Sequence, residues 1–124
     1  DEFITAIDFP IVRGWQGYSK VGVRNAMVIS VASACLVADH ENANVRIALG
    51  SVGPTIIRCR DAEAWLKSTQ DLSAGQSISL DVAHEFGQRA AAESSPIDDH
   101  RSTAQYRRHA ISVLASRLLR KAYQ

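Results

Sequence analysis

The first half of the chain carries short apolar runs that are typical of β-strands. Each run is rich in β-branched or aromatic residues and is bounded by glycine, proline or polar turn residues. We expect extended segments at Phe3–Phe9, Tyr18–Val23, Met27–Ala38, Val45–Leu49 and Thr55–Cys59, with a turn at Arg13–Gly17. Because short turns separate these segments, they predict one antiparallel sheet.

From Asp61 onward the apolar residues recur every three or four positions, and this period predicts helices. Asp61 is the expected N-cap of a short helix, and either Ser77 or Ser79 is the expected N-cap of a second. Ser102, followed three residues later by Gln105, has the capping-box spacing and predicts the start of a third, long helix.

The predicted third helix is amphipathic. Its apolar face needs a surface to pack on, and Arg107, Arg108 and Arg120 are expected to stay in solvent. Strands followed by helices predict an α+β fold, an antiparallel sheet of about four strands with about three helices on one face. A length of 124 residues suits a single domain, 1–124, with one core.

Charge and composition narrow the classes of partner. Lysine and arginine number 14 against 13 acidic residues, and a net charge of +1 gives no electrostatic reason to expect a nucleic-acid or membrane partner. Charged residues interrupt every apolar run before the roughly 20 residues of a bilayer span, so we expect a soluble, cytoplasmic protein. Strand character from Asp1–Ile4 onward is typical of a domain cut from a longer chain.

Cysteines and histidines do not show metal-ligand spacing. Cys35 and Cys59 lack a CxxC neighbour, and we expect two buried free thiols, with a cross-strand disulfide as the alternative. No histidine has a second ligand three or four residues away, so we expect solvent-facing or hydrogen-bonded structural roles for all of them and no metal site. The four are His40, His84, His100 and His109.

The common catalytic motifs are missing from the sequence, and we expect no catalytic residue. Asp99 and His100 are adjacent and form an alternative catalytic pair, but a carboxylate just before a helix is already explained by the helix dipole. Arg101, Arg107 and Arg108 can pair with the acids of this turn and clamp it.

A loop near the start of the chain is the best candidate for ligand contact. Lys20 and Arg24 place two cations beside Gly22 and Asn25, which suits a phosphate or an electron-rich ring. A solvated loop is the alternative interpretation.

Four segments, in this order, resemble a known family. They are Glu2–Pro10, Tyr18–Arg24, the run RIALGSVGPT at Arg46–Thr55, and Pro96–Arg108 with its P-x-x-D-x-R-S-x-x-Y-R-R pattern. Together they are similar to the C-terminal domain of the FAD-binding medium subunit in the xanthine dehydrogenase and carbon monoxide dehydrogenase family of molybdenum hydroxylases.

The resemblance implies a role in electron transfer. In that family the medium subunit carries FAD between an iron–sulfur subunit and an external acceptor, while a molybdopterin subunit hydroxylates the substrate. The resemblance implies that an N-terminal FAD-binding domain, missing from this sequence, holds most of the FAD and that the C-terminal domain closes over the flavin. By matched position, Ile4 packs on the isoalloxazine and Lys20 approaches its polar edge.

The same resemblance places Arg24 and Asn25 among the cofactor-binding residues, where the loop Arg24–Met27 borders the entry of the acceptor. Several relatives have an acidic residue in this loop and this chain has none, so the acceptor is not assigned. The alternative function is a stand-alone binding or scaffold module derived from the same domain, without redox activity of its own.

Overall fold

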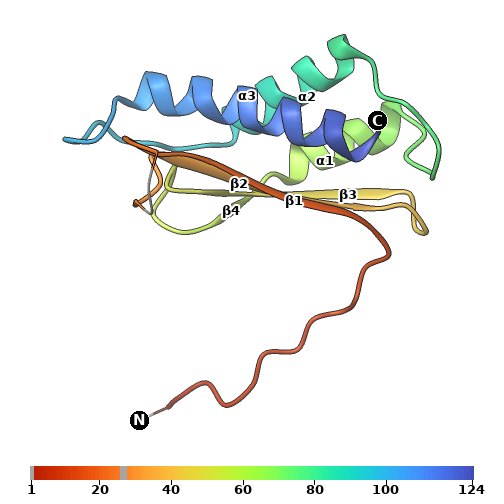
Figure 1. Cartoon of the computed structure of the whole chain (residues 1–124), viewed down its shortest axis with the longest axis horizontal. Helices are drawn as coiled ribbons and strands as arrows, with labels where there is room; N and C mark the ends of the chain where they lie inside the picture. The colour runs from red at the N-terminus through yellow and green to blue at the C-terminus, as the bar shows by residue number, and fades with distance from the viewer. Residues whose placement is uncertain (1, 26–27) are drawn as a thin grey trace.

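One antiparallel sheet and a layer of helices make up the fold (Figure 1). The structure is a computed structural model that describes residues 2–25 and 28–124. The strands lie side by side in chain order, and each pairs antiparallel with the next. They are β1 (Gly14–Val21), β2 (Ala32–Asp39), β3 (Asn44–Gly50) and β4 (Ile57–Arg58).

All three helices follow the strands and lie on the same side of the sheet (Figure 1). They are α1 (Arg60–Thr69), α2 (Leu80–Ala92) and α3 (Ala104–Ala122). The predicted α+β fold, with four strands and with three helices on one face, is confirmed. None of the helices in the described ranges is long and apolar enough to cross a membrane.

Alternation along the strands gives the sheet two different faces. In β2, Leu36 and its even-numbered neighbours are fully buried beneath the helices, and Ile47 pairs with Leu36 on the same side. The residues between them point to the opposite side, which no helix in residues 2–25 and 28–124 covers; we call this side the open face. Its members are Gln16, Tyr18, Lys20, Cys35, Val37, Arg46 and Ala48.

Of the three predicted helix starts, that of α2 is confirmed and that of α3 is off by one residue. Ser79 is the N-cap of α2, as predicted, and its hydroxyl accepts from the Val82 N–H at 3.3 Å. The α3 cap is Thr103 instead of Ser102, because the backbone of Ser102 is already bonded to Asp99 in the preceding turn.

Helix α1 is capped by a residue from another helix. The N-cap position is Cys59, which makes no side-chain cap, so the prediction of Asp61 as the N-cap was wrong. The Glu93 carboxylate, just after α2, accepts from the Ala62 N–H at 2.9 Å and from the Asp61 N–H at 3.4 Å. This side chain satisfies donors at the α1 start that a local sequence pattern cannot assign.

The predicted strands were less accurate than the fold. Phe3–Phe9 is not a strand, and the predicted turn at Arg13–Gly17 contains the start of β1. The long predicted strand from Met27 begins only at Ala32, and Met27 itself lies outside the described residues. Residues 3–9 have strand-forming side chains, but the described part of the chain offers them no paired neighbour.

Both cysteines are free, and they differ in exposure. Cys59 is fully buried, as predicted, and burial raises the pKa of its thiol to about 12. Cys35 lies on the open face and is exposed, so the prediction that it is buried was wrong. It occupies the outward position of an otherwise apolar strand, where the period of two decides exposure.

Candidate functional site

Tyr18 and Lys20 lie at the end of β1 on the open face. The register pairs Tyr18 with Cys35 and Lys20 with Ser33, so both side chains share the side of the sheet that the helices leave free. Both are exposed. The alternation of β1 therefore places a cation and a phenol where a ligand or another domain can approach.

The segment 28–30 returns along these two side chains. Lys20 Nζ donates to the Val28 carbonyl at 2.9 Å, and the Tyr18 hydroxyl lies 3.4 Å from Ser30 Oγ. The hydrogen bond with Ser30, assisted by one with Ser33, lowers the pKa of Tyr18 below its ordinary value. An ammonium has three N–H donors, and the Val28 carbonyl uses one of those on Lys20.

The loop after β1 is held close to the same segment. A side chain at Gly22 would place its Cβ 2.6 Å from Cγ2 of Val28, so glycine permits this close approach. Arg24 and Asn25 follow and are exposed. The rest of the predicted loop, Ala26 and Met27, lies outside the described residues.

A hollow of about 510 Å³ joins this loop to the turn before α3, and we call it the loop hollow. Val23 and Ile29, both exposed, give it an apolar part, and cationic side chains come from both segments. Its lining residues are Val23, Arg24, Val28, Ile29, His100 and Arg101. Apolar surface beside arginine suits a planar anionic group.

Arg107 holds the acidic turn in place. Its guanidinium donates to Asp99 Oδ1 at 2.7 Å, to the Ser51 carbonyl at 2.7 Å and to the Val31 carbonyl at 3.0 Å. The prediction that Arg107 stays in solvent was wrong, because only 4% of it is exposed, whereas the predicted clamp between an arginine and this turn is present.

Asp99 is bonded to its own turn as well as to Arg107. The backbone N–H groups of Arg101 and Ser102 donate to its Oδ1 at 2.9 and 3.1 Å. The hydrogen bond from the Arg101 N–H lowers the pKa of Asp99 most, and the bond from the Arg107 guanidinium adds to this effect. Together they hold the pKa at about 2. These bonds support the interpretation of Asp99 as a turn-forming residue over its alternative as a catalytic partner of His100.

Asp99 is expected to stabilise the fold except at strongly acid pH. Its pKa of about 2 lies below the ~3.9 of an unfolded chain, so the stabilisation is complete above about pH 4 and is lost as the pH falls through 2. Asp99→Asn should therefore lower the melting temperature at pH 7, and the deficit should shrink between pH 4 and pH 2. Melting curves of both proteins across this range test the point; a deficit that is constant down to pH 2 would contradict it.

Ile4 lies apart from the other predicted site residues. It belongs to residues 2–13, the extended segment that leaves the start of β1 on the side opposite the helices and that we call the tail (Figure 1). With 81% of its surface exposed, Ile4 is not packed against Lys20, Arg24 or Asn25. Lys20 therefore lies near the loop, whereas the tail leaves the domain on the same side of the sheet as the open face.

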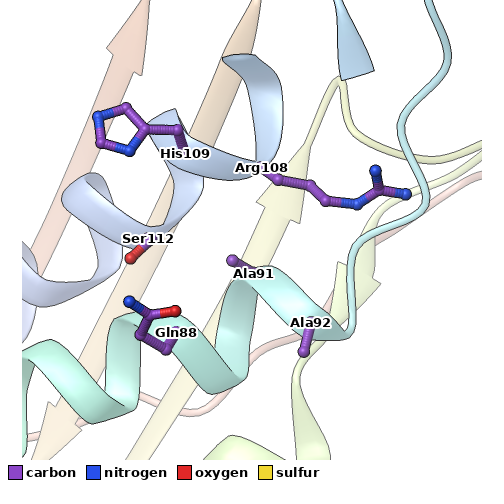
Figure 2. A pocket seen from close by; sticks show the side chains of 6 residues that line it. All are labelled: Gln88, Ala91, Ala92, Arg108, His109 and Ser112. Atoms are coloured by element: carbon purple, nitrogen blue, oxygen red, sulfur yellow. The ribbon is translucent and has the colours of Figure 1, made fainter. Parts of the chain in front are cut away.

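A second hollow, of about 300 Å³, lies between α2 and α3, on the helical side of the molecule. Figure 2 shows Gln88 and Ser112 between the two helices, with the Arg108 and His109 side chains directed away from each other. It contains none of the predicted site residues. Within residues 2–25 and 28–124, no three potential metal ligands gather in one place.

Comparison with known proteins gives consistent results. The family model of the CO dehydrogenase flavoprotein C-terminal domain matches residues 18–122. The glyceraldehyde dehydrogenase medium chain of Sulfolobus acidocaldarius is 24% identical over 123 residues, which are 97% of this chain and 41% of that relative. This chain thus spans about two fifths of the relative's length.

Solved structures share the fold. Carbon monoxide dehydrogenase from Hydrogenophaga pseudoflava matches with a TM-score of 0.69 at 24% identity, and quinoline 2-oxidoreductase from Pseudomonas putida 86 matches with 0.66 at 20% identity. Each match covers 86% of this chain and 36% of the solved chain. At these identities the matches establish the architecture, and the assignment of site residues depends on the geometry described above.

Proposed function

The chain belongs to the family of the CO dehydrogenase flavoprotein C-terminal domain, and from this premise we propose that it closes over the flavin of a molybdenum hydroxylase. In this role residues 1–124 form one domain of the FAD-binding medium subunit, and an N-terminal domain holds most of the FAD. The bound flavin supplies electron transfer from iron–sulfur clusters to an external acceptor. The subunits that carry iron–sulfur clusters and molybdopterin are the partners of this medium subunit.

The observation that carries the proposal is the position of Lys20. Its ammonium lies on the open face, is fixed by the Val28 carbonyl and has N–H donors beyond that bond. A fixed cation of this kind can donate to the polar edge of a flavin and favours negative charge there. The exposed phenol of Tyr18 is two residues away on the same face.

The residues present fit one edge of a flavin. The open face offers Lys20 and Tyr18, and the tail offers the aliphatic side chain of Ile4 for packing on a ring. A glycine-rich loop for the pyrophosphate does not occur in the sequence, which is consistent with a second domain holding that part. Arg24, which lines the loop hollow, and the next residue, Asn25, would border the entry of the acceptor.

Substitutions in the complete medium subunit test these roles. Lys20→Ala is expected to slow flavin reduction about tenfold or more, since a charge-assisted hydrogen bond contributes about 1.5–3 kcal/mol. Ile4→Glu is expected to lower the flavin content, because it brings a carboxylate against an apolar ring. Absorbance spectra give the flavin content, and stopped-flow measurements give the reduction rate.

Arg46→Ala is the matched control, because it removes a different exposed cation from the open face. It should leave both readouts unchanged. If Lys20→Ala and Ile4→Glu also leave both unchanged, neither residue belongs to the flavin site. A complete protein that neither binds flavin nor associates with redox subunits would favour the stand-alone binding module instead.

A further inference from the structure

The tail exposes an unusual amount of apolar surface. Five large apolar side chains between Phe3 and Ile11 are 77% to 92% exposed. They are Phe3, Ile4, Ile7, Phe9 and Ile11. Removing apolar side chains of this size from water is favourable, so a contiguous set of them in water indicates a surface that another part of the protein covers.

The order of residues in the tail is that of a strand. Phe3, Thr5, Ile7 and Phe9 share one side of an extended chain, and Ile4 and the residues at alternate positions share the other. Pro10 then ends the run, as it does at the end of a strand. One side is therefore large and apolar, while the other combines Ile4 and Ala6 with the acids Glu2 and Asp8.

The domain closes its own core without this segment. The buried residues of the core begin at Val31, with Trp15 and Val21 packed against them from β1. The tail runs away from the sheet on the side opposite the helices (Figure 1). The domain's own helices therefore do not cover the apolar side of the tail.

The comparisons separate the tail from the pattern of the domain itself. The family model of the domain begins at residue 18, after the tail, whereas the similarity to the medium chain of Sulfolobus acidocaldarius extends over 97% of this chain. The tail thus lies outside the domain pattern but within the region shared with a medium chain. More than half of that relative lies beyond the matched region.

We propose that residues 3–9 add as a β-strand to the FAD-binding part of the medium subunit. This inference rests on the proposed function and names the contact that joins the two parts. Phe3, Ile7 and Phe9 enter the core of the FAD-binding part, and Ile4 faces the other way. The backbone N–H and C=O groups of the tail pair with an edge strand of that part, as in strand addition to an open sheet.

Hydrogen exchange of the tail amides tests the proposal. In the isolated chain of 124 residues, the amides of residues 4–9 are expected to exchange as fast as in an unstructured peptide. In the complete medium subunit they are expected to exchange at least a hundredfold more slowly. Ile7→Asp in the complete subunit should remove most of this protection, because it places a charge on the buried side.

Ala6→Asp is the matched control, since it adds the same charge one residue away on the opposite side. It should leave the protection largely in place. Fast exchange in the complete subunit would overturn the proposal, and so would protection in the isolated chain, either as a monomer folded on itself or as a dimer. Flavin content is read on the same samples: a protected tail in a flavin-free subunit supports the strand and sinks the proposed flavin role.

Discussion

Arg107→Met is expected to lower the free energy of unfolding by about 2–4 kcal/mol, because a buried polar group that is left without its hydrogen-bond partner costs about 1–3 kcal/mol and this change affects the Val31 and Ser51 carbonyls together. The side chain is 4% exposed, and its guanidinium serves three acceptors on three separate segments. Methionine has a similar length but no donor, so the Val31 and Ser51 carbonyls and the Asp99 carboxylate lose their shared partner. Urea denaturation at pH 7 measures the change.

Arg108→Met is the matched control for this substitution. Arg108 is the next residue along α3 and is exposed, so the same change there should alter the free energy of unfolding by no more than about 0.5 kcal/mol. If the two variants lose equal stability, the buried arginine is not what holds the acidic turn. A loss confined to Arg107→Met would establish it as the link between α3 and the sheet.

The position of Arg107 also connects the fold to the candidate site. Its acceptors lie just before β2, just after β3 and in the turn that precedes α3. That turn supplies His100 and Arg101 to the loop hollow, opposite Arg24. The interactions that fix the helix on the sheet therefore also set the shape of this hollow.

Local patterns predicted the architecture, because strand and helix periods follow from residues close in sequence. The Ser79 cap shows this well, since a serine and the N–H three residues later are sufficient to define it. Arg107 was misassigned because its burial depends on carbonyls 56 and 76 residues away. The α1 start was misassigned for the same reason, since its cap comes from Glu93.

The candidate site was predictable only in part. Lys20 could be placed on an exposed strand position by alternation, but the Val28 carbonyl that fixes it comes from a segment that the sequence predicted as part of a strand. Nothing local to Arg24 indicates that it shares a hollow with His100 and Arg101, because the contact joins the two ends of the fold. Ile4 was assigned to the flavin site only by resemblance to the family, and its role there stays a prediction.

Glu63→Ala is expected to lower the free energy of unfolding by about 2–4 kcal/mol, most of it from one backbone group. Glu63 is 9% exposed, and its carboxylate accepts from the Ile47 N–H at 2.9 Å. Strand β4 is only two residues long, so this carboxylate takes the place of a strand partner for Ile47 in β3. Leaving a buried N–H without an acceptor costs about 1–3 kcal/mol, and the cavity left by the missing side-chain atoms adds to this cost.

Glu63→Gln separates the hydrogen bond from the charge. Glutamine keeps an oxygen for the Ile47 N–H but cannot form the ion pair with Arg58. Because the Arg58 side chain is 41% exposed, Glu63→Gln should lower the free energy of unfolding by about 1 kcal/mol or less. Denaturation curves of Glu63→Ala and Glu63→Gln should therefore give clearly different free energies of unfolding. Equal losses would mean that the pair with Arg58 carries the stabilisation. A large gap would identify Glu63 as a side-chain extension of the β3 hydrogen-bond ladder, one that anchors α1 to the sheet whose open face carries Lys20.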